Sequence, residues 1–205
     1  MNVNDMIHYP SYAKNFIATF PQLEKDHPWN VVASIIPLLQ QTIRTLKSEF
    51  RVVNDVAIHK SANIEEHVTL KGPIIISAGC FVGAHAYLRG GVFLGEKSIV
   101  GPGCEIKSSL IMSSSALAHF NFVGDSLLGS YVNMEAGSII ANHYNERLDK
   151  TIHVWINNEK VQINSTKFGA LVGDHSKIGA NAVLSPGTIL SPNSIVKRLE
   201  LVEQG

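Results

Sequence analysis

The chain has 205 residues, of which 45% are hydrophobic, and its 17 basic and 17 acidic residues balance to a formal net charge of zero. This length provides for one domain with a hydrophobic core and a small additional segment. The balanced charge gives no electrostatic surface for nucleic acid or an anionic membrane, so we expect neither as a partner. No signal peptide is visible, and the longest apolar run, residues 31–39, is too short to span a bilayer, so we expect a cytoplasmic protein.

Residues 1–50 carry helical signals, and we interpret them as an N-terminal helical segment. A short helix is expected over residues 11–20, and a second is expected to start at Asp26-His27-Pro28-Trp29. Apolar residues then recur at alternating spacings of four and three, which predicts an amphipathic helix that Pro37 kinks. These residues are Val32, Ile36, Leu39, Ile43, Leu46 and Phe50. We expect this helix to cap the exposed end of the domain that follows; the alternative is an oligomer contact.

An aliphatic residue recurs at every sixth position across residues 52–106. The positions are Val52, Ile58, Ile64, Leu70, Ile76, Val82, Leu88, Leu94, Val100 and Ile106. A hexapeptide repeat produces this period, and it predicts a solenoid of short parallel strands around a prism-shaped core. Three hexads make a coil of 18 residues, so positions 18 apart are expected to stack about 4.8 Å apart. Gly83, Gly95 and Gly101 directly follow aliphatic positions, as tight corners require.

The repeat changes register twice farther along the chain. A second register covers residues 110–140 and begins two residues early, so one turn after Ile106 is expected to be shortened. A third register covers residues 172–196. Between them lies an excursion at about residues 142–168, in which two β-rich runs flank Asn157-Asn158 and predict a hairpin. The predicted domains are the helical segment, residues 1–50, and the β-helix domain, residues 51–205.

Two cations fall at stacked positions of the repeat. Arg89 and Lys107 are 18 residues apart, and each directly follows an aliphatic position, so they are expected to lie one above the other. Stacked cations repel each other unless an anion lies between them, and a phosphate-bearing ligand is the functional interpretation. The alternatives are that Glu105 neutralises them or that both side chains point into water.

His119 falls in the second register, at an expected corner of the solenoid. A histidine beside an anion site is a candidate general base, because imidazole exchanges a proton near neutral pH. The alternative is an ordinary surface histidine. Hexapeptide-repeat carbonic anhydrases bind metal with a second histidine five residues later, and this position is Gly124, so no metal is expected.

Several ordered motifs between Glu105 and Val196 resemble one family. They are Glu105-Ile-Lys107-Ser-Ser, Ala118-His119-Phe-Asn-Phe122-Val-Gly-Asp125-Ser, Val132-Asn133-Met-Glu135-Ala136-Gly137-Ser, Ala141-Asn142 and Lys167-Phe-Gly-Ala-Leu-Val-Gly-Asp174. This segment resembles the acetyltransferase half of bifunctional sugar-1-phosphate nucleotidyltransferases, of the glucosamine-1-phosphate N-acetyltransferase type. The resemblance implies a mainly β fold, a left-handed parallel β-helix, whose handedness the repeat alone does not specify. No Gly-rich nucleotide-binding loop precedes the segment, so the nucleotidyltransferase half is not expected in this sequence.

The resemblance also implies roles for single residues. His119 matches the general base that deprotonates the sugar amine as it attacks the thioester of acetyl-CoA, the expected co-substrate. Arg89, Lys107 and Lys167 match cations that hold the sugar phosphate, and Asn133 matches a sugar-binding asparagine. Asn142 matches a residue near the acyl group and pantetheine, while Ala136 and Ala180 match positions whose backbone contacts CoA. The family forms trimers with each site between adjacent solenoids, so a homotrimer with shared sites is expected.

Three features depart from the family pattern. Phe122 stands where a tyrosine hydroxyl commonly contacts the sugar phosphate, so this substrate-binding position lacks one hydrogen bond. Glu135 replaces the first glycine of a Gly-Ala-Gly turn, where it could crowd or repel a polyanionic cofactor. The chain ends soon after Val196, where related enzymes add coils that help to hold CoA. Lys197 and Arg198 are candidates to bind the cofactor phosphates instead, and the alternative is a solvated C-terminus.

The sequence therefore predicts an acyltransferase that moves an acetyl or related acyl group from CoA to the amine of a phosphorylated or nucleotide-linked amino sugar. One alternative is a sugar acyltransferase of lipid precursor synthesis that takes a longer chain from acyl carrier protein. Another is a non-catalytic assembly or regulatory solenoid. Glu135 and the short C-terminus favour this last interpretation, whereas the retained cations and His119 argue against it.

Overall fold

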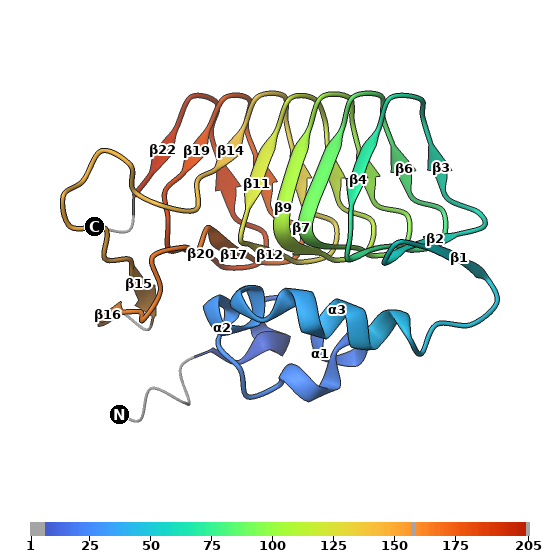
Figure 1. Cartoon of the computed structure of the whole chain (residues 1–205). Helices are drawn as coiled ribbons and strands as arrows, with labels where there is room; N and C mark the ends of the chain where they lie inside the picture. The colour runs from blue at the N-terminus through green and yellow to red at the C-terminus, as the bar shows by residue number, and fades with distance from the viewer. Residues whose placement is uncertain (1–6, 157–158, 204–205) are drawn as a thin grey trace.

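The computed structural model describes residues 7–156 and 159–203. Short parallel strands wind into a solenoid with three flat faces, and the N-terminal helices lie along one of them (Figure 1). Within the described residues the strands form a seven-stranded sheet, a 13-stranded sheet and a separate two-stranded hairpin. The predicted fold class, a mainly β hexapeptide-repeat solenoid, is confirmed.

The three faces are numbered in the order in which the chain meets them within a coil. Face 1 is the seven-stranded sheet of β3 (Asn63–Ile64), β6 (Phe81–Val82), β8 (Ile99–Val100), β10 (Ala116–Leu117), β13 (Asn133–Met134), β18 (Lys177–Ile178) and β21 (Ile195–Val196). Face 2 contains β4 (Thr69–Lys71), β11 (Phe122–Gly124), β14 (Ile139–Ile140), β19 (Val183–Leu184), β22 (Leu201–Val202) and the first parts of β7 (Tyr87–Leu94) and β9 (Glu105–Ile111). Face 3 contains β1 (Phe50–Val53), β2 (Val56–His59), β5 (Ile74–Ile76), β12 (Leu127–Leu128), β17 (Ala170–Val172), β20 (Thr188–Leu190) and the second parts of β7 and β9. Faces 2 and 3 belong to one sheet because β7 and β9 bend from one face onto the other.

The six-residue repeat fills the interior of the prism. Its aliphatic residues from Ile76 to Ile106 are fully buried in one cluster, which also contains Cys80 and Cys104 from corner positions. A Cβ atom on Gly83 would lie 2.8 Å from the backbone nitrogen of Pro102 in the next coil, so close stacking of coils requires glycine there. The first position of the repeat, Val52, lies outside the solenoid, because β1 pairs antiparallel to β2 and leaves this side chain exposed.

The predicted second register is wrong by one residue in its first half. Ile111, Leu117 and Val123 point into the core, each one residue after the predicted position. Phe122 is instead half-buried on face 2, beside Glu105 of the preceding coil. The reason is a register shift in which three steps along β7 match two steps along β9, so the coils here contain 17 residues. The third register is confirmed by the buried residues Val172, Ile178, Leu184 and Val196.

The helical segment contains η2 (Tyr9–Ser11), α1 (Phe16–Thr19), η3 (Pro21–Leu23), α2 (Pro28–Ala33) and α3 (Ile35–Ile43). The helix predicted to start around Pro28 is α2, which begins at Pro28 with His27 as its N-cap residue. Pro37 does more than kink the helix: α2 ends before Ser34, and α3 begins so that proline falls in its first turn, where no N–H is needed. Ile35 therefore faces the core, and Ile36, predicted to do so, is exposed. No helix among the described residues has the length and apolar character needed to cross a membrane.

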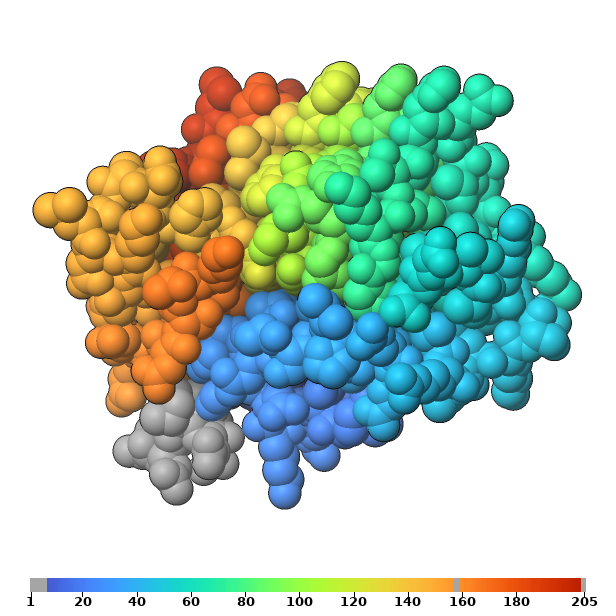
Figure 2. Space-filling model, viewed as in Figure 1, coloured from blue at the N-terminus to red at the C-terminus, as the bar shows by residue number. Residues whose placement is uncertain are grey.

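The helices cover a flank of the solenoid and not its end, contrary to the expected position of the cap. Figure 1 and Figure 2 show the helical segment, in blue, along the underside of the coils. The outward side chains of face 3 are apolar, and Phe93 meets Phe20 with ring centroids 5.0 Å apart. An apolar sheet face must pack against another layer, which is why the helices lie on this flank.

The excursion between β14 and β17 holds an antiparallel hairpin of β15 (His153–Ile156) and β16 (Glu159–Gln162). The Asn157-Asn158 turn predicted for it lies outside the described residues. Ile152, Val154 and Ile156 join the apolar cluster that the helices form with face 3. The hairpin thus packs with the helical layer, while the division of the chain at residue 50 stays a prediction.

Candidate functional site

A ladder of cations runs along the corner where face 2 turns into face 3. Lys71, Arg89 and Lys107 are in register on β4, β7 and β9. Arg89 and Lys107 therefore lie one above the other, as their 18-residue spacing predicts. This corner faces the helical layer on one side and the open surface of face 2 on the other.

Two carboxylates already accompany the predicted pair. Arg89 donates to Glu105 Oε1 from Nε at 2.8 Å and from Nη2 at 2.7 Å. Lys107 Nζ lies 2.5 Å from Asp125 Oδ2, and the side-chain amide of Asn142 donates to the same oxygen. The alternative of neutralisation by Glu105 thus applies to Arg89, and Asp125 does the same for Lys107.

A groove of about 390 Å³ opens between this corner and the junction of α2 and α3. Lys107, Asp125 and Lys167 line it from the solenoid side, and Ala33 and Ile36 line it from the helices. Lys167 reaches this place because the excursion returns here: Phe168 N–H donates to the carbonyl of Asn142 at 3.0 Å. Three chain segments that are far apart in the sequence therefore meet around two lysines.

His119 lies at the opposite edge of face 2, in the turn from face 1 to face 2 between β10 and β11. Its carbonyl accepts a hydrogen bond from Gly137 N–H at 2.8 Å, which ties the turn to the next coil. The buried amide of Asn121 also bridges these coils, donating to the carbonyls of Glu135 and Ser138. The ring of His119 is exposed and forms no hydrogen bond within the described part of the chain.

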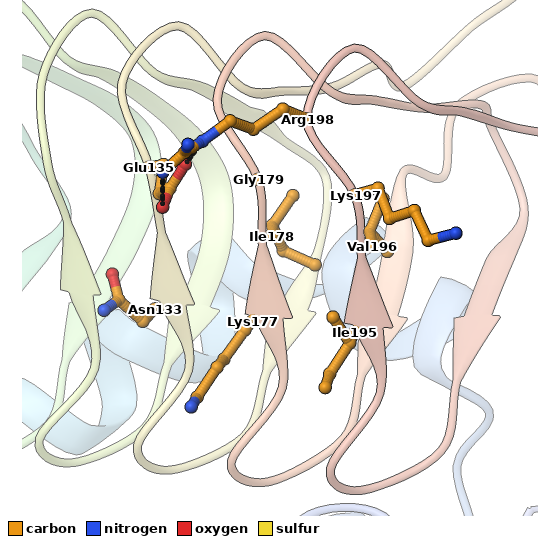
Figure 3. Close-up of a pocket in the computed structure, with 9 residues that line it drawn as sticks. All are labelled: Asn133, Glu135, Lys177, Ile178, Gly179, Ile195, Val196, Lys197 and Arg198. Carbon is orange, nitrogen blue, oxygen red and sulfur yellow. Dashed lines mark hydrogen bonds and ion pairs between the residues drawn. The ribbon is translucent and has the colours of Figure 1, made fainter.

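The same corner carries Ala136, Ala180 and Arg198 on the coils that follow. Glu135 accepts a hydrogen bond there from Ala180 N–H at 2.9 Å. It also accepts hydrogen bonds from Arg198 Nε and Nη2 at 2.8 and 3.0 Å (Figure 3). The guanidinium and the backbone N–H lower the pKa of Glu135 to about 2, and the pair raises the pKa of Arg198. Glu135 is therefore not an unpaired charge, and Ala180 N–H and Arg198, two of the groups expected to meet CoA, are already bonded to it.

Asn133 lies on face 1, beside a groove of about 500 Å³ that also contains Lys177, Ile195 and Lys197 (Figure 3). Asn142 is buried at the corner of faces 2 and 3 with Asp125, away from Ala136 and Ala180.

The predicted site residues therefore lie in four separate places within a single chain. The corner of faces 2 and 3 holds Arg89, Lys107, Asn142 and Lys167; the corner of faces 1 and 2 holds His119, Ala136, Ala180 and Arg198; Phe122 lies on face 2 and Asn133 on face 1.

Sequence reasoning missed two parts of this arrangement. Asp125 lies one position beyond Gly124, the residue that is in register with Lys107 in the 17-residue coil. An acidic residue about one coil after Lys107 is the sequence signal that could have identified this partner. The helix wall formed by Ala33 and Ile36 has no such signal, because nothing in the repeat shows which face the helices cover. Among the described residues no group of three or more histidine, cysteine or acidic side chains is placed to hold a metal ion.

The repeat and this geometry indicate the class of protein to which the chain is similar. A family model described as "Hexapeptide repeat of succinyl-transferase" matches residues 73–107 and 164–197, so the chain is similar to the hexapeptide-repeat acyltransferase family.

Two relatives are similar to this chain over most of its length. The chain is 35% identical over 162 residues to "Bifunctional protein GlmU" of Methanococcus vannielii. This alignment covers 70% of this chain and 38% of that protein. It is also 30% identical over 183 residues to "Bifunctional sugar-1-phosphate nucleotidylyltransferase/acetyltransferase" of Sulfurisphaera tokodaii. This alignment covers 83% of this chain and 45% of that protein. The predicted resemblance is confirmed, and the chain spans less than half the length of these relatives.

A solved structure of PerB from Caulobacter crescentus, in complex with CoA and GDP-perosamine, is more distant. It is 17% identical, with a TM-score of 0.31 over 80% of this chain and 61% of that one.

Proposed function

We propose that this protein transfers an acyl group, most simply acetyl, from a CoA thioester to the amine of a phosphorylated or nucleotide-linked amino sugar. The observation that carries the proposal is the meeting of Arg89, Lys107 and Lys167 around one corner beside a groove. The motifs that contain Lys107 and Lys167 resemble those of the glucosamine-1-phosphate N-acetyltransferase type, and one relative's name includes an acetyltransferase.

The acceptor phosphate would bind at this corner. Lys107 uses one N–H on Asp125 and keeps two for a ligand, because an ammonium group has three donors. Arg89 likewise keeps donors on its second terminal nitrogen. The carboxylates then hold both cations in place while the remaining donors bind phosphate oxygens. Phe122 would lie against the sugar on face 2 without a hydrogen bond.

His119 would act as the general base of the transfer. The amine nitrogen forms a bond to the thioester carbonyl carbon, the C–S bond breaks, and the amine proton passes to the imidazole and then to the CoA thiolate. Binding the two substrates in a reactive arrangement lowers the barrier further. In this scheme Asn133 contacts the sugar, the backbones of Ala136 and Ala180 contact CoA, and Asn142 and Arg198 serve the pantetheine and phosphate ends. No metal and no covalent enzyme intermediate is needed.

The division of these residues between faces 1 and 2 supports a homotrimer, in which face 1 of one subunit meets face 2 of the next. We place this trimer in the cytoplasm.

The second candidate is a non-catalytic assembly or regulatory solenoid. The ion pair of Glu135 with Arg198 favours it, because this pair fills part of the expected donor site. The third candidate is a sugar acyltransferase whose acyl donor is acyl carrier protein. Comparing the turnover rate with acyl carrier protein and with acetyl-CoA separates this candidate from the first.

Replacing the proposed base tests the leading candidate. His119→Ala should lower the rate of thiol release from acetyl-CoA with a sugar phosphate by about 10²- to 10⁴-fold, the usual contribution of a general base. Calorimetric titration should show that CoA and the sugar phosphate still bind. His85→Ala, at an exposed turn of the same corner on an earlier coil, is the matched control and should keep full activity. A His119→Ala protein as active as the wild type would remove the proposed base.

A further inference from the structure

Glu135 joins three successive coils at the corner of faces 1 and 2. Its own turn belongs to the coil of β13, its backbone partner Ala180 to the coil of β18, and its ion-pair partner Arg198 to the coil of β21. One carboxylate is thereby held by a backbone N–H and by two nitrogens of a guanidinium, of which Figure 3 shows the guanidinium contact. A guanidinium and a backbone N–H directed at the same point form a binding site for an anion.

Within the part of the chain that the structure describes, the same carboxylate–amide contact occurs once more, at the opposite end of the solenoid. Glu65 occupies the equivalent turn position, and its Oε2 accepts a hydrogen bond from Ala84 N–H at 2.7 Å. No arginine joins that contact in the described chain. The backbone contact is thus a recurrent way to join two coils, and what distinguishes Glu135 is the addition of Arg198.

The Glu135 contact is exposed to solvent. The side chain of Arg198 is 73% exposed and that of Glu135 is 43% exposed, so water screens the pair and a competing anion can reach it. The neighbouring N–H of Ala136 has no hydrogen-bond partner among the described residues. One of the two backbone positions expected to meet CoA is therefore open, and the other is filled by the protein's own carboxylate.

We propose that Glu135 determines affinity for the acyl donor by occupying Ala180 N–H and the Arg198 guanidinium, from which a phosphate group of CoA must displace it. This inference rests on the proposed function, since it takes the donor to be a CoA thioester. Bound donor would take the Ala136 N–H directly and Arg198 by exchange. The displaced carboxylate would move into solvent, which its exposure allows.

The charge state of Glu135 keeps this competition present at physiological pH. Because the Arg198 guanidinium and the Ala180 N–H hold the pKa of Glu135 near 2, the carboxylate is ionised throughout the neutral range. Lys177 and Lys197 also line the groove, and Glu135 is the one carboxylate among the described residues that line it. Glu200 lies beside the groove, where its Oε2 accepts a hydrogen bond from Lys197 N–H at 2.6 Å. Without Glu135 the side chains that line the groove would carry only positive charge, which favours a polyanionic donor.

Glu135→Gln tests the inference because glutamine keeps the size of the side chain and removes its charge. Calorimetry with CoA should give a dissociation constant lowered by about fivefold, the upper end of what one exposed charge pair contributes. Titration with pantetheine, which lacks phosphate, should show no gain. Glu65→Gln removes the matching carboxylate at the other end of the solenoid and should leave the affinity for CoA unchanged.

Several outcomes would overturn the inference. Glu135→Gln could bind CoA no more tightly than the wild type, gain equally for pantetheine, or share its gain with Glu65→Gln. If the wild type transfers acetyl groups in any of these cases, only the role of Glu135 is lost. If no variant binds CoA and none transfers an acyl group, both the inference and the proposed function fail. Thermal unfolding of each variant checks that it is folded, and Glu135→Ala repeats the test with the side chain removed.

Discussion

At the scale of single residues, the balance of charge at the corner of faces 2 and 3 decides which cation attracts a phosphate most strongly. Arg89 and Lys107 each have a carboxylate partner, Glu105 and Asp125, at 2.7 and 2.5 Å. Lys167 has none within ion-pair distance among the described residues, and it lines the same groove. Lys71 belongs to the same ladder, so the four cations and two carboxylates leave two positive charges, on Lys71 and Lys167, and of these two lysines Lys167 lines the groove.

Lys167→Met should therefore weaken acceptor binding with little effect on the donor. Loss of one charge-assisted hydrogen bond is worth about 1.5 kcal/mol, so the KM for the sugar phosphate should rise about tenfold. The KM for acetyl-CoA should stay within about twofold. Steady-state kinetics with each substrate varied in turn measures both.

Lys160→Met is the matched control for this change, because Lys160 is an exposed lysine on the same excursion, in β16. It should leave both Michaelis constants unchanged. An equal rise for donor and acceptor in Lys167→Met would show that the lysine has no selective contact with the phosphate.

At the scale of elements, the fold could be predicted where one local period decides it. Each inward aliphatic residue from Ile76 to Ile106 could be identified because six-residue spacing depends only on neighbouring turns. The shortening of a turn after Ile106 could be predicted, but its extent could not, since Leu110 and Ile111 are both aliphatic and only pairing with β7 shows which one points inward. The flank covered by the helices depends on the same register, because it decides which apolar residues face outward.

The candidate site, like the fold, could be predicted only where the spacing within the repeat decides it. The stacking of Arg89 on Lys107 follows from spacing within one repeat and could be predicted. The arrival of Lys167 and of the α2–α3 wall at this corner depends on where an excursion and a helical layer pack, and no period encodes that. The pairing of Glu135 with Arg198 spans 63 residues and two further coils, so it appears only in three dimensions.

The helical layer should depend on Phe93 for its attachment to face 3. Phe93→Ala removes a ring that is 8% exposed and packs edge-on against Phe20, so it should lower the free energy of unfolding by about 3 kcal/mol. Chemical denaturation measures this change, and limited proteolysis should cut earlier within residues 7–50. Phe120→Ala, which removes a ring that is 73% exposed, should change the stability far less. Similar losses in both variants would contradict an attachment through face 3.

At the scale of the whole molecule, two faces remain free to meet another solenoid. Face 3 is covered by helices, whereas face 1 exposes Ile99 and Ile195 and face 2 exposes Ile139 and Leu201. Asn133 on face 1 and Lys167 at the far corner of face 2 cannot serve one acceptor within a single chain, because the width of face 2 separates them. A cyclic trimer in which face 1 meets face 2 brings such residues together in every interface.

A complementation experiment tests this shared site. The wild type should run as a particle of three times the 22.3 kDa chain mass in light scattering. Asn133→Ala damages only face 1, and Lys167→Glu damages only the corner beside face 2, so each alone should have little activity at low acceptor concentration. Mixed trimers, co-expressed with two tags and purified through both, contain one interface in which both faces are intact. They should recover about a third of the wild-type rate, because one of three sites is complete. If each site is built within one subunit, mixed trimers stay as inactive as their parents, and the shared site is wrong.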